Sequence, residues 1–382
     1  MYLLLLAVIY LAFISLGLPD SLLGAAWPTI YAEFDVPLSY MGIVTMIISA
    51  GTITSSLLTD RLTKKFGTKY VTTVSVLLTA IAMLCFSMAG EFYHLCLIAI
   101  PYGLGAGAID ASLNNYVALH YSSRHMSWLH SFWGVGTIIS PYIMSYALTH
   151  SVWTDGYRIV SYIQLAIFLS LVLALPLWKI NKSVDMGQTD VKPLRLIDAL
   201  RIEGVIEVIV GFMAYCAAES TAMLWSSSYF EGIFALSKED AAALGSIFFI
   251  GMTVGRFISG FISDRLGDKK MIILGTVIAF GGILLMGIPF LEVSIAGFIL
   301  FGLGCAPIYP SIIHSTPIRF GQERSQSIIG IQMAAAYFGA TFMPPLFGLI
   351  ANNVSLKLMP IYLVIFVLLV IIMMLRLDKK AG

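Results

Sequence analysis

The sequence predicts an all-α integral membrane protein in which twelve transmembrane helices form two pseudo-symmetric halves of six. The first observation is the composition, because 59% of the 382 residues are hydrophobic and only 11% are charged, and the mean hydropathy is +0.90. The second is a series of apolar runs of about 20 residues, each long enough to cross a hydrocarbon core of about 30 Å as a helix. The third is a sequence repeat between the two halves. A β-barrel would instead show alternating segments of about ten residues.

The predicted helices are separated by short polar segments and by one longer one. They span 2–26, 38–59, 69–90, 94–118, 127–149, 157–179, 205–229, 241–263, 270–291, 293–314, 326–350 and 357–376. The first span has a polar interruption at Asp20 but no basic leader and no A-x-A site, so we expect a retained helix rather than a signal peptide. The longer polar segment, 180–203, is expected to be a cytoplasmic linker between an N-terminal bundle, 1–179, and a C-terminal bundle, 204–382, with an amphipathic surface helix as an option.

The basic residues are distributed unevenly between the two sides of the membrane. Most of the 22 Lys and Arg residues follow spans 2, 4, 6, 8 and 10 or lie in the C-terminal tail, whereas the opposite loops hold only Arg158, Lys238 and Lys357. By the positive-inside rule, both termini are cytoplasmic, and we expect a multi-pass protein of the cell (inner or plasma) membrane. Because the basic clusters are short and follow the topology, nucleic acid is not an expected partner.

A short motif recurs at the same place in each half. TDRLTKKFGTKY follows span 2 and SDRLGDKK follows span 8, so each copy joins an Asp-Arg pair to a glycine and basic residues. Matched copies of this kind indicate an internal repeat. The alternative is that both are merely basic cytoplasmic loops. The motif residues are Asp60, Arg61, Gly67, Asp264, Arg265 and Gly267.

This pair of loops resembles the loop motif of the major facilitator superfamily, which implies the fold of that family and secondary transport. The aspartate of such a loop can face the N-terminus of a neighbouring helix, the glycine permits a tight turn, and the basic residues hold the loop in the cytoplasm. The first copy has two extra residues before Gly67.

Four fully charged residues lie inside predicted spans, where a charge costs at least about 2.5–3.5 kcal/mol and is usually functional. They are Asp20, Asp110, Glu219 and Arg256. Asp110 shares one helical face with Gly103, Gly107 and Asn114, so another helix or a ligand can approach it closely. A carboxylate in low-dielectric surroundings holds a proton more readily than one in water, which is the property that a proton-coupled carrier needs. The alternative for Asp110 is an internal hydrogen-bond partner.

Each half has a carboxylate on its first helix. Asp20 precedes Trp27 by seven residues, and Glu219 precedes Trp225 by six, which is a symmetric arrangement used by alternating-access carriers. Glu219 is expected to bind a sugar hydroxyl, relay a proton or help to coordinate sodium. For Arg256 we expect a structural role, in which it snorkels or donates to backbone carbonyls.

Among the neutral groups, His130 is a possible proton partner, and Trp133 and Trp225 could stack on a sugar ring. The alternatives are a satisfied buried histidine and ordinary aromatic packing. The four cysteines lie inside spans without metal-ligand spacing, so neither a disulfide framework nor a metal site is expected.

Further stretches resemble the fucose permease branch, the fucose/galactose/glucose:proton symporters. They are GAGAIDASLNNYV, YCAAESTAMLWSSSYF, GLGCAPIYPSI and GIQMAAAYFGATFMPPLFGLIA, from both halves. The resemblance implies that Asp110 acts in sugar-coupled protonation, although the family usually has Glu there. The family's membrane aspartate in span 1 would fall at Gly24, one turn after Asp20, and its substrate-facing amides would fall at His130 and Trp133.

The sequence therefore predicts a secondary active transporter, not an enzyme, that moves a small hydrophilic solute, a sugar, by proton-coupled symport with alternating access. Asp110, Asp20 and Glu219 would couple protons. The expected substrate-binding residues, which would line a central cavity, are Asn114, His130, Trp133, Glu219 and Trp225. The proton is the expected coupling ion, with sodium as the alternative and no other cofactor. The expected partners are the substrate and the lipid bilayer, and we expect a monomer.

Three other functions stay open. The 18 methionines keep proton-coupled export of amphipathic drugs or lipids possible, and a non-transporting receptor is a second option. A membrane enzyme is conceivable because carboxylates and His130 occur together, but no catalytic motif supports it. No G-x-x-x-x-G-K-[ST] motif is present, so ATP-driven transport is not indicated.

Overall fold

The computed structural model describes residues 2–181, 194–245 and 247–381, and within these ranges the chain is helical with no strand. The predicted all-α fold is confirmed. Eleven of the described helical segments are long and apolar enough to cross a membrane. Helix α6 (Ser123–His150) corresponds to the predicted span 127–149 but is not among the eleven, because it mixes histidine and hydroxyl residues with apolar ones.

Residue contacts divide the chain into two compact units. Unit 1 comprises Met1–Tyr116 and Leu129–Leu194, and unit 2 comprises Val117–Trp128 and Arg195–Gly382. The segment Val117–Trp128 therefore belongs to unit 2. It comprises the end of α5 (Phe92–His120), the turn that follows and the start of α6, and we call it the α5–α6 connection. The rest of α5 and α6 belongs to unit 1. Most of the predicted linker, 182–193, lies outside the described residues, and α9 (Leu196–Leu200) is the short helix that follows it.

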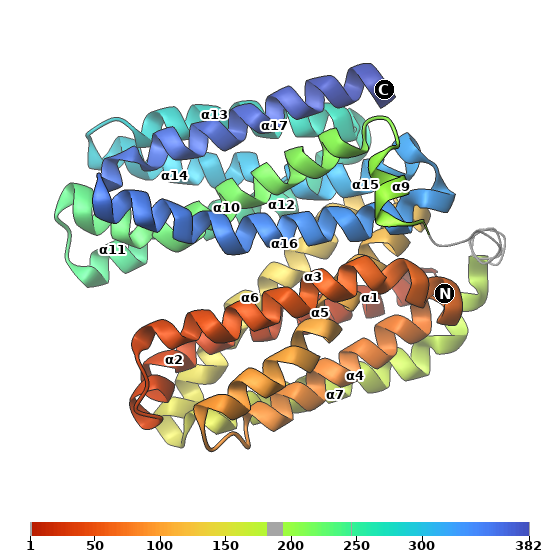
Figure 1. Cartoon of the computed structure of the whole chain (residues 1–382), viewed down its shortest axis with the longest axis horizontal. Coiled ribbons are helices and arrows are strands. Elements are labelled where there is room, and N and C mark those ends of the chain that lie inside the picture. Colours follow the sequence, from red (N-terminus) through yellow and green to blue (C-terminus); the bar gives the residue numbers. More distant parts are fainter. Residues whose placement is uncertain (1, 182–193, 246, 382) are drawn as a thin grey trace. The chain divides into compact units, whose positions relative to one another are not determined.

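Unit 1 is built from seven helices, with short 3₁₀ turns at Leu38–Tyr40 and Leu175–Asn181. Helix α7 packs against both α1 and α4, as seen in Figure 1. The helices are α1 (Tyr2–Asp20), α2 (Leu22–Glu33), α3 (Met41–Phe66), α4 (Thr68–Phe86), α5 (Phe92–His120), α6 and α7 (Trp153–Ala174).

Unit 2 has α10 in contact with both α16 and α17, while α14 packs against α12 and α13 (Figure 1). A 3₁₀ turn at Leu356–Leu358 precedes the last helix. Besides α9, the helices are α10 (Val205–Phe234), α11 (Lys238–Gly245), α12 (Ile247–Leu266), α13 (Asp268–Met286), α14 (Leu291–Cys305), α15 (Ile308–Phe320), α16 (Gln322–Asn353) and α17 (Met359–Ala381).

Two predicted spans are interrupted in the structure. The first predicted span breaks at Ser21, directly after Pro19 and Asp20. The predicted span 241–263 covers parts of α11 and α12, and residue 246 between them lies outside the described residues. The predicted span 293–314 is divided between α14 and α15 at Pro307, whose ring nitrogen cannot donate to the preceding turn, and α15 continues to Phe320.

Candidate functional site

The central polar group of unit 1 is a chain of three buried side chains from two helices. The Asn114 amide Nδ2 donates to the Asp110 carboxylate at 2.7 Å, one turn earlier on α5. The Asn114 Oδ1 lies 3.1 Å from Nε2 of His130 on α6. Because the amide oxygen only accepts, Nε2 carries the proton in this contact. The three side chains thus form a continuous hydrogen-bonded path from a carboxylate to an imidazole.

The glycines on the Asp110 face serve helix packing. A Cβ atom on Gly103 would lie 2.4 Å from the Ile48 carbonyl oxygen, and one on Gly107 would lie 2.4 Å from the Thr52 carbonyl oxygen. Both acceptors are on α3, so this stripe brings the α3 and α5 backbones together. Of the two options left open by the sequence, a helix rather than a ligand occupies this stripe, and Asp110 is 5% exposed beside it.

Asp20 forms a second polar cluster in unit 1, at the break between α1 and α2. One carboxylate oxygen accepts from the Trp133 indole nitrogen at 2.8 Å, and the other accepts from the Tyr102 hydroxyl at 3.1 Å. Asp20 remains exposed, Trp133 is half-buried and Tyr102 is buried. The carboxylate is thus held by side chains of α5 and α6 while staying accessible.

Close packing of α1 on α6 positions this cluster. A Cβ atom on Gly17 would lie 2.1 Å from the Trp133 carbonyl oxygen, and one on Gly136 would lie 2.5 Å from the Ile14 carbonyl oxygen. Only glycine allows the two backbones to approach this closely. The contact brings Trp133 beside Asp20, which lies one turn after Gly17.

Unit 2 contains a buried ion pair that the sequence did not reveal. The Arg256 guanidinium on α12 donates to the Glu219 carboxylate on α10 at 2.7 Å, and the side chains are 4% and 10% exposed. The structure therefore adds to the expected structural role of Arg256 a carboxylate partner that the sequence did not indicate. The partners are 37 residues apart on separate helices, so no local spacing connects them. Two opposite charges inside the membrane region were the only signal of a pair.

Trp225, the remaining aromatic candidate, lies on α10 in unit 2. Its indole nitrogen donates to the Pro344 carbonyl on α16 at 2.9 Å, and its ring packs edge-on against Phe347 at 5.6 Å between centroids. The side chain is half-buried. These contacts fix the indole in the packing between α10 and α16.

Both loop motifs form sharp turns between antiparallel helices. Gly67 and Gly267 have φ values of +83° and +76°, which is the left-handed region that favours glycine. In the first copy, Asp60 pairs with Lys64 at 3.1 Å, and Arg61 is exposed.

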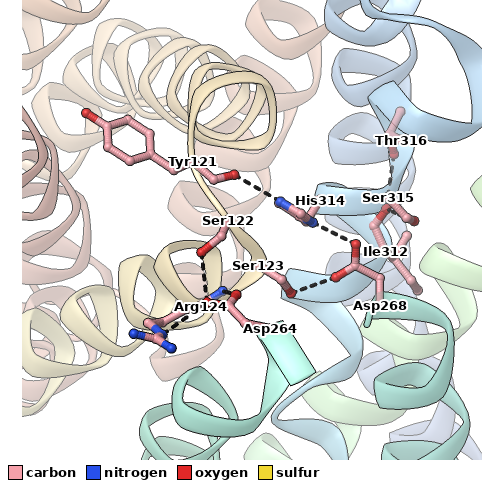
Figure 2. Close-up of polar contacts among 10 residues, drawn as sticks. All are labelled: Tyr121, Ser122, Ser123, Arg124, Asp264, Asp268, Ile312, His314, Ser315 and Thr316. Atoms are coloured by element: carbon pink, nitrogen blue, oxygen red, sulfur yellow. Dashed lines mark hydrogen bonds and ion pairs between the residues drawn. The ribbon is translucent and has the colours of Figure 1, made fainter. Parts of the chain in front are cut away.

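In the second copy, Asp264 accepts from the backbone nitrogen of Arg124 at 3.0 Å and from the Ser122 hydroxyl at 3.1 Å, whereas Arg265 is exposed (Figure 2). Arg124 lies in the first turn of α6, so Asp264 faces a helix N-terminus, which is the arrangement expected for this motif.

All four cysteines are free thiols, of which Cys216 and Cys305 are buried. In the part of the chain that the structure describes, no three His, Cys, Asp or Glu residues are grouped so as to hold a metal ion.

The helix architecture, the repeated loop motif and the intramembrane polar groups define a multi-spanning membrane transport protein. The family model of the Major Facilitator Superfamily matches residues 9–202 and 208–382. The chain belongs to the Major Facilitator Superfamily, as its loop motifs indicated, and it is a transporter rather than an enzyme.

Solved structures share the fold over nearly the whole chain. The crystal structure of the transporter FucP in the outward conformation is 16% identical, with a TM-score of 0.80 and coverage of 98% of both chains. The proton:xylose symporter XylE is 14% identical, with a TM-score of 0.81, and covers 100% of this chain and 96% of its own. At these identities the similarity concerns the fold.

Curated relatives differ in what they transport. The glucose/mannose transporter GlcP of Bacillus subtilis is 20% identical over 371 residues, covering 91% of this chain and 88% of its own. The probable nitrate/nitrite antiporter NarK1 of Thermus thermophilus is 23% identical over 356 residues, covering 82% and 76%. A small-molecule cargo is common to both names.

Proposed function

We propose that this chain carries a small hydrophilic solute, a sugar, across the cell membrane by proton-coupled symport. The observation that carries the proposal is the buried path from Asp110 through Asn114 to His130. A carboxylate of this kind in a membrane helix is costly unless it is used, and an imidazole is the side chain best suited to exchange protons near neutral pH. In our proposal, Asp110 is the protonation switch, and Asn114 and His130 join it to the substrate.

Asp20 and Trp133 are the proposed sugar contacts of unit 1. The accessible carboxylate and the half-buried indole combine a hydrogen-bond acceptor with an apolar ring face, which suits a ring with alternating hydroxyl and C–H surfaces. Glu219, held by Arg256, and Trp225 are the proposed contributions of unit 2. The names of the relatives support this substrate class, because FucP is described as a fucose:proton symporter and GlcP as a glucose/mannose transporter.

The proposal includes the organisation inferred from the sequence. Two bundles, 1–179 and 204–382, work as a monomer with both termini in the cytoplasm, and the proton is the coupling ion, with sodium as the alternative. Proton-coupled export of amphipathic compounds is the competing function, and ligand sensing without transport is the third.

The deciding experiment is transport by the purified full chain in proteoliposomes. We expect counterflow of at least one hexose or pentose from a panel, and uphill uptake of that sugar when the lumen is made alkaline without sodium. Uptake that requires a sodium gradient would identify sodium, rather than the proton, as the coupling ion. Dye efflux without counterflow of any sugar would support the exporter, and saturable binding with no counterflow would support a receptor.

A further inference from the structure

A histidine far along the chain from Asp110 lies between two hydrogen-bond acceptors. On α15, Nδ1 of His314 is 2.6 Å from the Asp268 carboxylate, and Nε2 is 3.0 Å from the carbonyl oxygen of Tyr121 (Figure 2). The His314 and Asp268 side chains are 12% and 8% exposed, so water cannot easily replace these contacts. All three residues belong to unit 2.

For both contacts of His314 to be hydrogen bonds, one more proton is needed than a neutral histidine and an ionised aspartate carry between them. A neutral imidazole has one N–H and one lone pair, whereas the carbonyl of Tyr121 can only accept and an ionised Asp268 can only accept. With a proton on each ring nitrogen, or with one shared between Nδ1 and Asp268, both contacts are hydrogen bonds. After that proton leaves, a ring lone pair faces an oxygen lone pair at one of the two positions. Both contacts are therefore complete only while the additional proton is present.

The contacts of this pair attach the connection between α5 and α6. Tyr121 lies in that connection, and Ser123, which begins α6, donates to the second oxygen of Asp268 at 2.6 Å. Asp268 begins α13, where a carboxylate is favoured by the helix dipole. Because α5 up to Tyr116 and α6 from Leu129 belong to unit 1, the attached connection is continuous with two helices of that unit.

The charged groups on the surrounding elements are mostly paired with one another. On the connection and α12, Arg124 pairs with Asp264 at 3.1 Å. Lys269 of α13 and Arg319 of α15 both pair with Asp378 of α17, at 3.2 and 2.8 Å, and Glu207 of α10 pairs with Lys380 at 2.6 Å. Other titratable or charged groups of these elements include His120 and His125 on the connection and the exposed Arg265, Lys270, Glu323 and Arg324.

A second attachment of the same segment does not involve a histidine. Asp264 accepts from Ser122 at 3.1 Å and from the Arg124 backbone nitrogen at 3.0 Å. These contacts join a carboxylate to a hydroxyl and to a backbone N–H, neither of which titrates near neutral pH. The connection is thus held at two neighbouring points, and the point at Asp268 includes the imidazole of His314.

We propose that His314 and Asp268 form a regulatory proton-binding site that holds the α5–α6 connection against α13 and α15 when protonated and releases it when deprotonated. The site is separate from Asp110, Asp20 and Glu219, so it goes beyond the proposed coupling role. In the expected topology it faces the cytoplasm, where alkaline conditions would loosen the connection.

Hydrogen–deuterium exchange on the purified full chain tests the site without any substrate. The readout is the protection of the 121–128 peptide between pH 5.5 and 8.5, corrected for the intrinsic pH dependence of exchange. We expect protection in the wild type to fall about tenfold over this range, since a hydrogen bond to a charged group is lost. In His314→Gln, protection should be low and independent of pH. Asp268→Asn should also lose the pH dependence, because an asparagine amide can donate to a neutral imidazole.

Two controls separate this site from its surroundings. His125→Gln removes a titratable ring from the same segment and should leave the wild-type pH profile intact. Asp264→Asn weakens the second attachment, so it should lower protection at every pH while keeping the pH dependence. A flat wild-type profile would overturn the proposal, as would a pH dependence that survives in His314→Gln and Asp268→Asn or one that disappears in His125→Gln.

Discussion

The Glu219 carboxylate on α10 accepts a hydrogen bond from the Arg256 guanidinium on α12 at 2.7 Å, in the interior of unit 2. Both side chains are almost fully removed from the surface. Each charge therefore depends on the other, because a lone ion in this environment would lose its hydration without compensation.

Neutralising one partner should destabilise the protein. Arg256→Gln should lower the free energy of unfolding by about 3–5 kcal/mol, because it leaves the Glu219 carboxylate buried without its counter-ion. Arg265→Gln is the matched control, since Arg265 is exposed on the same helix. Thermal unfolding in detergent measures both. The double variant Glu219→Gln/Arg256→Gln should be more stable than Arg256→Gln. If both variants lose the same free energy of unfolding, the two charges do not depend on each other.

Asp110→Asn should separate coupling from binding. Asparagine can still accept from Asn114, so the fold and sugar counterflow should persist, but the side chain can no longer take up a proton. Uphill uptake driven by a pH gradient should be lost. The control Asp155→Asn changes a half-buried carboxylate paired with Arg158 and should accumulate sugar normally. Proton-driven accumulation by Asp110→Asn would remove Asp110 from the coupling mechanism.

Trp133→Phe should weaken sugar binding by about tenfold. The change keeps an aromatic ring but removes the N–H that orients the Asp20 carboxylate, and a hydrogen bond to a charged group contributes about 1.5–3 kcal/mol. Trp178→Phe is the control, because the buried Trp178 indole nitrogen has no hydrogen-bond partner among the described residues. Titration of the bound sugar by intrinsic fluorescence or calorimetry compares the two, and equal affinities would argue against a role for Asp20 in binding.

Gly17→Ala tests the close packing that positions Asp20. Its Cβ would lie 2.1 Å from the Trp133 carbonyl oxygen, so the helices must move apart, at a cost of about 1–3 kcal/mol. In contrast, a Cβ on Gly24 would have no atom within 4 Å. Gly24→Ala should therefore be neutral or slightly stabilising. If both variants unfold at the same temperature, α1 and α6 are not in backbone contact at this point.

Much of the fold could be predicted because it depends on local properties of the chain. Apolar run length identified the transmembrane helices, and the polar residue Asp20 marks the point at which the first one breaks. The division of the predicted span 293–314 was missed, since average hydropathy does not register the single backbone donor that Pro307 lacks.

The sequence by itself determined that charges lie inside membrane helices, that a loop motif is repeated and that glycines line the Asp110 face. Only the tertiary structure decided which groups meet. It joined Asp110 to His130 through Asn114, Asp20 to Trp133, Glu219 to Arg256 and His314 to Asp268. Hydrophobicity and helix periodicity act within one segment, whereas a hydrogen bond between helices depends on the relative rotation of two packed segments, which the spacing along either one does not specify.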